Sequence, residues 1–100
     1  MVQITISPKF ISQLKEISEY LTENRSVEFA QALVEKAFEE IADLQRFPQR
    51  WQQIEIPGVE GEFRRILLGA YQIFYEKSSE QITIHSIIDG RRRPPLFSPN

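Results

Sequence analysis

The side chains best suited to chemistry lie in the C-terminal half of the chain, between Phe63 and Arg93. Arginine occurs there as the neighbours Arg64 and Arg65 and again as a run of three, residues 91–93. Because a guanidinium donates two parallel hydrogen bonds, such arginines suit a phosphate or carboxylate ligand. Charged runs also mark ordinary solvated boundaries, and both interpretations stay open for Arg65 and for the run.

His85 is the only histidine in the chain. An imidazole titrates near physiological pH, so this side chain is a candidate acid or base. A plain surface histidine is the alternative.

Composition excludes several other kinds of site. The chain has no cysteine, which excludes disulfides, thiolate zinc sites and cysteine nucleophiles. It has no phosphate-binding glycine loop, cluster of metal ligands or nucleophile triad, so we expect neither a cofactor nor a metal. No apolar run approaches the roughly 20 residues that cross a bilayer, and the N-terminus lacks the basic-then-apolar pattern of a signal sequence. We expect a cytoplasmic protein without a membrane partner.

Charge is unevenly distributed along the chain. Residues 1–48 hold five Lys/Arg and eight Asp/Glu, a net of −3, whereas residues 63–93 hold six basic and three acidic residues, a net of +3. The formal net charge of −2 argues against indiscriminate nucleic-acid binding, because non-specific affinity comes from neutralising phosphates. A local basic face is compatible with this balance.

A tight turn determines where the arginines point. Residues 68–71 (LGAY) place a glycine at the first central position of a two-residue hairpin loop. Pairing outward from this turn places Arg65 opposite Phe74 and Arg64 opposite Tyr75. Side chains alternate along a strand, so the two arginines lie on opposite faces. We expect Arg64 to stack on Tyr75 and to pair with an acidic group from a helix or a loop.

The next turn, residues 77–80 (KSSE), is expected to be a four-residue loop that pairs Glu76 with Gln81. This register places His85 opposite Gln72. No carboxylate then lies beside the imidazole to orient it.

The strands have two different faces in this register. The expected core face carries Ile66, Leu68, Tyr71, Ile73, Tyr75, Ile82, Ile84 and Ile88. The other face, called the open face below, carries Arg65, Leu67, Gln72, Phe74, Thr83, His85 and Ile87. The open face is too polar for a core and too apolar for an ordinary surface, so its side chains are candidates for binding.

The N-terminal half predicts a strand followed by a helix. Apolar and polar residues alternate from residue 2 to residue 6, which is typical of a strand with one buried face. Ser7 can cap a helix, and Pro8 suits its first position, where the missing N–H costs nothing. We expect this helix to run from about residue 8 to residue 23.

A second helix follows closely. Asn24 is expected to be the left-handed residue after the first helix, and Ser26 to cap the second. The apolar stripe of the second helix should end near residues 45–47, because Pro48 biases the residue before it away from helical geometry. So short a connection predicts an antiparallel helix hairpin.

The remaining segments have no regular period. We expect residues 49–62 to form an ordered loop anchored by Trp51, and the proline-rich tail, from about residue 94 to residue 100, to be extended. One hundred residues suit a single domain. The predicted fold class is α+β.

The order of strand, helix hairpin and three-strand meander, together with five short stretches, resembles the RelE/ParE superfamily of toxins from bacterial type II toxin–antitoxin systems. The stretches are residues 44–48 (LQRFP), 63–66 (FRRI), 69–75 (GAYQIFY), 82–88 (ITIHSII) and 90–92 (GRR). The resemblance covers nearly the whole chain. It implies a β-α-α-β-β-β fold with the helix hairpin packed on one face of a mainly antiparallel sheet.

The resemblance also implies a function. Members of this superfamily are small cytosolic proteins encoded beside a neutralising antitoxin, in systems of the plasmid-stabilisation type. One branch cleaves mRNA on the ribosome, and the ParE-like branch inhibits DNA gyrase. Fold cannot decide between the branches, because function depends on the surface side chains.

In the ribonuclease branch an arginine commonly follows the first tyrosine of the hairpin, where this chain has Gln72. A tyrosine or histidine helps the chemistry near the C-terminus, where this chain has Phe97 or Ser98. Only Arg92 keeps a matching arginine, with Arg65 a looser counterpart. The resemblance therefore favours a ParE-like protein that binds its target and is not an enzyme.

Two alternatives stay open, an inactive toxin homologue and an mRNA endonuclease with Arg65, His85 and Arg92 as its catalytic candidates. The expected partners are a cognate antitoxin and either gyrase or the ribosome with its mRNA. Contacts to the target or antitoxin are expected at Arg65, Gln72, Phe74, His85, Arg91, Arg92 and Arg93. The antitoxin should lay a helix or strand on exposed apolar positions, with acidic groups near the arginines.

Overall fold

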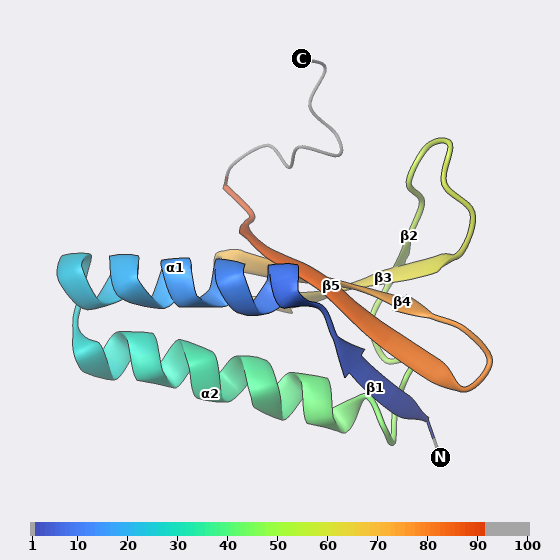
Figure 1. Ribbon diagram of the computed structural model, residues 1–100, viewed down its shortest axis with the longest axis horizontal. Coiled ribbons are helices and arrows are strands. Elements are labelled where there is room, and N and C mark those ends of the chain that lie inside the picture. Colours follow the sequence, from blue (N-terminus) through green and yellow to red (C-terminus); the bar gives the residue numbers. More distant parts are fainter. Residues whose placement is uncertain (1, 92–100) are drawn as a thin grey trace.

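The structure, a computed structural model, describes residues 2–91 and is an α+β fold (Figure 1). The elements are β1 (Gln3–Ile6), α1 (Pro8–Asn24), α2 (Val27–Asp43), β2 (Gln53–Ile54), β3 (Glu62–Leu68), β4 (Tyr71–Lys77) and β5 (Gln81–Asp89). The predicted extended tail, with Arg92 and Arg93, lies outside the described residues.

Ser7 caps α1 and also fastens it to the sheet. Its Oγ accepts the N–H of Phe10 at 3.1 Å, with Pro8 in the first helical turn, as the sequence predicts. The same hydroxyl donates to the carbonyl of His85 at 2.8 Å. The start of α1 is therefore held against β5.

The turn between the helices differs from the prediction. No residue other than glycine has a positive φ between residues 2 and 91, so Asn24 is not left-handed. Instead, the N–H groups of Arg25 and Ser26 both donate to the carbonyl of Leu21, which satisfies the end of α1 without such a residue. Ser26 caps α2 as predicted, accepting the N–H of Phe29 at 3.0 Å.

The strand order in the sheet is β1-β5-β4-β3-β2. β1 is parallel to β5, and the other pairs are antiparallel. The predicted β3–β4 register is confirmed from Leu68 opposite Tyr71 to Arg64 opposite Tyr75, and Gly69, with φ +60°, supplies the left-handed turn residue. The predicted loop 49–62 contains one short strand, β2, at the edge of the sheet.

The predicted β4–β5 register is wrong. The N–H of Ser78 donates to the carbonyl of Gln81, which closes a tighter turn than expected and places Lys77 opposite Ile82. Further along, the pairing shifts by one residue, because Tyr75 faces Ile84 whereas Phe74 faces Ser86. The residue left over is His85, which forms a β-bulge.

The bulge reverses which side chains of β5 face inward. Beyond His85 the alternation changes phase, so Ile87 joins the core with an exposed fraction of 1% and Ile88, predicted to be core, is only partly buried. Gln72 is therefore opposite Ile88 and not His85. The backbone N–H of Ile87 finds its partner in α1, donating to Oε1 of Gln13 at 3.0 Å.

The core lies between the helix pair and one face of the sheet. α1 and α2 run side by side on that face, with α1 against β5 and α2 against β3 (Figure 1). Its fully buried large side chains are Phe10, Leu44, Ile66, Ile73, Tyr75, Ile82, Ile84 and Ile87. Apart from the exchange of Ile87 for Ile88, the predicted core face is confirmed.

The bulge gives a stability prediction for two neighbouring isoleucines. Ile87→Ala should lower the free energy of unfolding by about 2–5 kcal/mol, because it leaves a cavity in the core. Ile88→Ala should cost about 1 kcal/mol or less. Urea denaturation of the two variants measures the difference, and an equal or reversed order would show that the phase of β5 is not changed at His85.

Candidate functional site

Arg65 lies on the open face, as the sequence predicts, opposite Phe74. Its side chain is partly buried, and the Nε atom is shielded from solvent without a hydrogen-bond partner among residues 2–91. An unpaired buried donor is costly and favours an acceptor supplied from outside. Arg65 therefore remains the strongest candidate on this face.

His85 has a carboxylate beside it, contrary to the sequence-based expectation. Its Nε2 lies 3.0 Å from Oε1 of Glu76, and its ring is tilted against Phe63 with the centroids 6.0 Å apart. The β4–β5 register predicted from the sequence was wrong, so it did not place Glu76 beside His85. A carboxylate at this distance orients an imidazole, so the pair is a candidate for proton transfer.

The other residues predicted on this face differ in accessibility. Phe74 is only 4% exposed and offers almost no contact surface. Gln72 is partly buried beside Gly90, where a Cβ would lie 2.9 Å from the Gln72 amide nitrogen. Hence the open face presents Arg65 and the pair of His85 with Glu76, while Gln72 is confined by its neighbour.

Arg91 lies apart from this group. Its guanidinium forms two hydrogen bonds with the carboxylate of Asp89, at 3.0 and 2.8 Å, and this contact raises the pKa of Arg91. The side chain is exposed and lines a groove beside the helices. The structure therefore separates Arg91 from Arg65, although the sequence had grouped them. Arg92 and Arg93 lie outside the described part of the chain.

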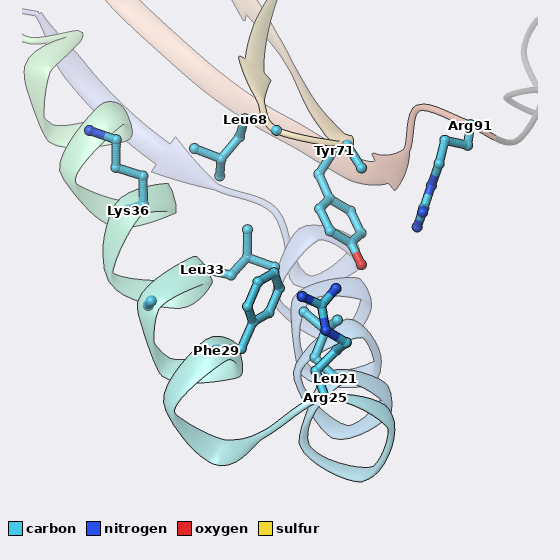
Figure 2. Close-up of a pocket in the computed structure, with 11 residues that line it drawn as sticks. Leu21, Arg25, Phe29, Leu33, Lys36, Leu68, Tyr71 and Arg91 are labelled. Carbon is cyan, nitrogen blue, oxygen red and sulfur yellow. The ribbon is translucent and has the colours of Figure 1, made fainter.

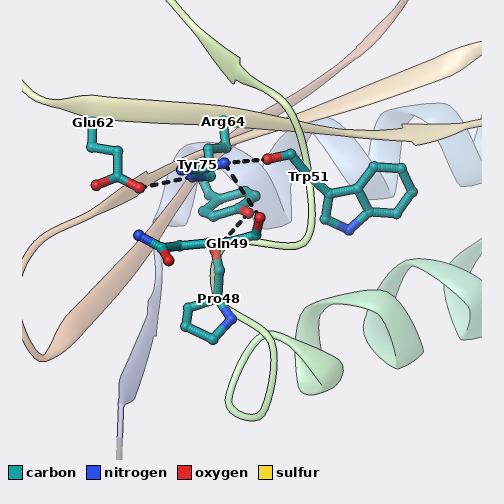
Figure 3. A network of polar contacts seen from close by, with 6 residues as sticks. All are labelled: Pro48, Gln49, Trp51, Glu62, Arg64 and Tyr75. Atoms are coloured by element: carbon teal, nitrogen blue, oxygen red, sulfur yellow. Dashed lines mark hydrogen bonds and ion pairs between the residues drawn. The ribbon is translucent and has the colours of Figure 1, made fainter.

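Arg64 has a structural role, but its partners differ from those expected (Figure 3). Its Nε donates to Glu62 of the same strand at 2.7 Å, and the Arg64 contact lowers the pKa of Glu62. Its NH1 donates to the backbone carbonyls of Trp51 and Gln49. A single guanidinium thus ties the loop after α2 to β3.

Tyr75 strengthens this attachment from the next strand. Its hydroxyl donates to the carbonyl of Pro48 at 2.9 Å (Figure 3). Burial raises the pKa of Tyr75 to about 12. Tyr75 is therefore a packed, neutral anchor and not a reactive phenol.

An apolar groove of about 460 Å³, which the sequence does not predict, lies between the helix pair and the β3–β4 hairpin (Figure 2). It is lined by Leu21, Arg25, Phe29, Ala32, Leu33, Lys36, Leu68, Gly69, Ala70, Tyr71 and Arg91. Phe29 is 41% exposed there, although it belongs to the apolar stripe of α2. The width of that stripe was the sequence signal for this groove, because the sheet covers only part of the stripe.

The described residues include no group of three or more His, Asp or Glu side chains placed to hold a metal ion. Among the same residues, no helix is both long and apolar enough to pass through a lipid bilayer.

The strand, helix pair and meander define the class of this protein as a toxin-like α+β fold of the RelE/ParE type. The sequence profile described as "ParE toxin of type II toxin-antitoxin system, parDE" matches residues 4–94. The chain therefore belongs to the ParE toxin family.

A solved structure, described as "Chromosomal ParDE TA system from P. aeruginosa", has the same fold. The TM-score is 0.70 at 19% sequence identity, over 87% of this chain and 94% of the other. At this identity the match supports the fold alone. A search of curated proteins gave no match.

The pKa of Tyr75 gives a prediction for alkaline stability. The folded state keeps the phenolic proton up to about pH 12, whereas a tyrosine in the unfolded chain loses it near the ordinary value of 10.0. The stability that Tyr75 contributes should be complete below pH 10 and lost as the pH rises towards 12. Tyr75→Phe should cost about 1 kcal/mol at pH 7, through the lost hydrogen bond, and should reduce the alkaline loss.

Urea denaturation of the wild-type chain and the variant at pH 7, 10 and 11.5 measures both effects. Tyr20→Phe is the control, because Tyr20 is 55% exposed. If the free energy of unfolding decreases with pH equally in the wild-type chain and in Tyr75→Phe, the raised pKa of Tyr75 would be contradicted.

Proposed function

We propose that this ParE-family toxin acts by binding DNA gyrase and is neutralised by a cognate antitoxin encoded beside it. The observation that carries the proposal is the match of the ParE toxin profile to nearly the whole chain. Gyrase and a newly made antitoxin are cytoplasmic, so we place the toxin there. In this role it would stabilise the replicon that carries its gene.

The open face supports binding more than catalysis. Cleavage of RNA by attack of a 2′-hydroxyl needs charge stabilisation together with proton transfer. Gln72 supplies a neutral amide, and its side chain is confined beside Gly90. Arg65 can bind an anionic group through its unpaired Nε, and this alone does not make a catalyst.

A second candidate function is cleavage of mRNA on the ribosome. The observation that favours it is the 3.0 Å contact between His85 and Glu76, with Arg65 on the same face. The carboxylate would orient the imidazole for proton transfer, while Arg65 would stabilise phosphate charge. A toxin homologue that has lost both activities is the third candidate.

Two assays run side by side distinguish the candidates. We expect the purified chain to inhibit supercoiling of relaxed plasmid by gyrase, and to leave a translated mRNA intact in primer extension. Arg65→Ala should weaken the inhibition about tenfold, because the variant loses a charged contact to the target. Thr5→Ala, at the exposed edge strand β1, serves as the control.

His85→Ala separates the two active candidates. Because His85 is also an expected contact on the open face, we expect the variant to weaken the inhibition of gyrase no more than Arg65→Ala does. If the wild-type chain cleaves the message, His85→Ala does not, and supercoiling is unaffected, the result would establish the endonuclease instead. If the chain neither inhibits gyrase nor causes cleavage of the message at any tested concentration, the result would favour the inactive homologue.

A further inference from the structure

The outer edge of β3 is only partly covered. β2 pairs with β3 at Phe63 and Arg64, and the carbonyl of Gln52 accepts the N–H of Arg65 at 3.3 Å. Beside residues 66–68, the described chain places no strand on the side of β3 that faces away from β4. The last three residues of β3 therefore form a free edge of the sheet.

Leu67 has its backbone polar groups on this free edge. Along an antiparallel strand, the N–H and C=O groups of alternate residues point to the same side. The N–H of Arg65 points away from β4, towards Gln52, so the backbone groups of Leu67, two residues later, point away from β4 as well. Neither group bonds to a loop or a side chain within residues 2–91. They can therefore pair with the backbone of another chain.

The side chain of Leu67 adds an apolar contact at the same place. It lies on the open face and is 51% exposed. Arg65 lies on the same face two residues earlier, and its guanidinium forms no ion pair with a carboxylate of residues 2–91. An extended segment paired with β3 can place an apolar side chain beside Leu67 and a carboxylate within reach of Arg65.

We propose that the free edge of β3 binds an extended segment of gyrase as an additional strand, with Leu67 supplying both the backbone hydrogen bonds and the apolar contact. This inference rests on the proposed inhibition of gyrase. The added strand continues the line of β2 along β3. Main-chain hydrogen bonds supply affinity in such strand addition, and the side chains beside Leu67 and Arg65 supply selectivity.

A second copy of this chain fits the edge poorly. Two copies of β3 related by a two-fold axis pair antiparallel, and their core faces coincide only if the paired residue numbers add to an even number. On the free residues 66–68, this allows only the pairing of 66 with 68, 67 with 67 and 68 with 66. Arg65 would then lie opposite Gly69 of the second copy, which has no side chain to pair with it.

Proline at position 67 tests the backbone contact. The variant Leu67→Pro loses only an N–H that points outward, and edge strands tolerate proline at such positions. Leu67→Ala removes the side chain and keeps the N–H. Gln53→Pro is the matched control, because Gln52 bonds to Arg65 and the N–H of the exposed Gln53 therefore points away from β3.

Calorimetry with gyrase measures the affinity of each variant, and supercoiling of relaxed plasmid measures its inhibition. We expect Leu67→Ala to weaken binding about fivefold and Leu67→Pro about fiftyfold, with Gln53→Pro within about threefold of wild type. The inhibition of supercoiling should follow the same order. Thermal unfolding checks that each variant is folded.

Amide hydrogen exchange of the wild-type chain tests the inference without any substitution. The N–H of Leu67 should exchange quickly in the free chain and about tenfold or more slowly when gyrase is bound, because a hydrogen bond then protects it. The N–H of Gln53 should exchange quickly in both states. Mass spectrometry measures the two amides.

The outcomes separate this inference from the function on which it rests. If gyrase binds Leu67→Pro as tightly as the wild-type chain and does not protect the Leu67 amide, the inference is overturned and the inhibition of gyrase stands. If the wild-type chain neither binds nor inhibits gyrase, the proposed function fails and the inference fails with it.

Two further results would assign the edge to another occupant and overturn the inference. The first is protection of the Leu67 amide that needs no gyrase and increases with the concentration of the chain, which would indicate a second copy. The second is protection by the product of the adjacent reading frame and not by gyrase, which would indicate the antitoxin.

Discussion

The extra residue at His85 in β5 is the constraint on which the rest of the structure depends. It changes the phase of the strand, so that Ile82 and Ile84 before it and Ile87 after it all face the helices. The backbone groups that the bulge displaces from the ladder find partners in Ser7 and Gln13. One insertion therefore fixes the core face, the position of α1 and the orientation of the only histidine.

The two candidate surfaces lie on opposite faces of the same sheet. The open face presents Arg65 and the pair of His85 with Glu76, whereas the groove on the helix side carries apolar side chains and Arg25. Because they lie on opposite faces, the two surfaces can be occupied independently of each other.

Much of the fold was predictable because local signals determine it. The glycine at position 69 set the β3–β4 register, and the cap at Ser7 set the start of α1. The β4–β5 register failed because a polar turn such as 78–80 does not specify its own length, and because a bulge has no sequence signature of its own. That one error misplaced Ile88 and concealed the carboxylate beside His85.

The candidate site was harder to predict than the fold. Arg65 was placed correctly, since alternation along a strand requires only the nearest turn. The groove depends on how far the helix pair stands from the β3–β4 hairpin, and the apolar stripe of α2 gives no measure of that distance. Arg91, expected among the same contacts, lies beside the groove, and its guanidinium is bound to Asp89 at the end of β5.

The attachment of residues 48–51 by Arg64 and Tyr75 bears on the order in which the chain folds. The hydroxyl of Tyr75 reaches a carbonyl 27 positions earlier in the sequence, and Arg64 reaches Trp51 from the strand that pairs with Tyr75. The two anchoring residues lie opposite each other in the β3–β4 pair, so both contacts require this hairpin. We therefore expect the connection after α2 to become fixed late in assembly, since a chain that ends at Leu68 does not yet contain Tyr75.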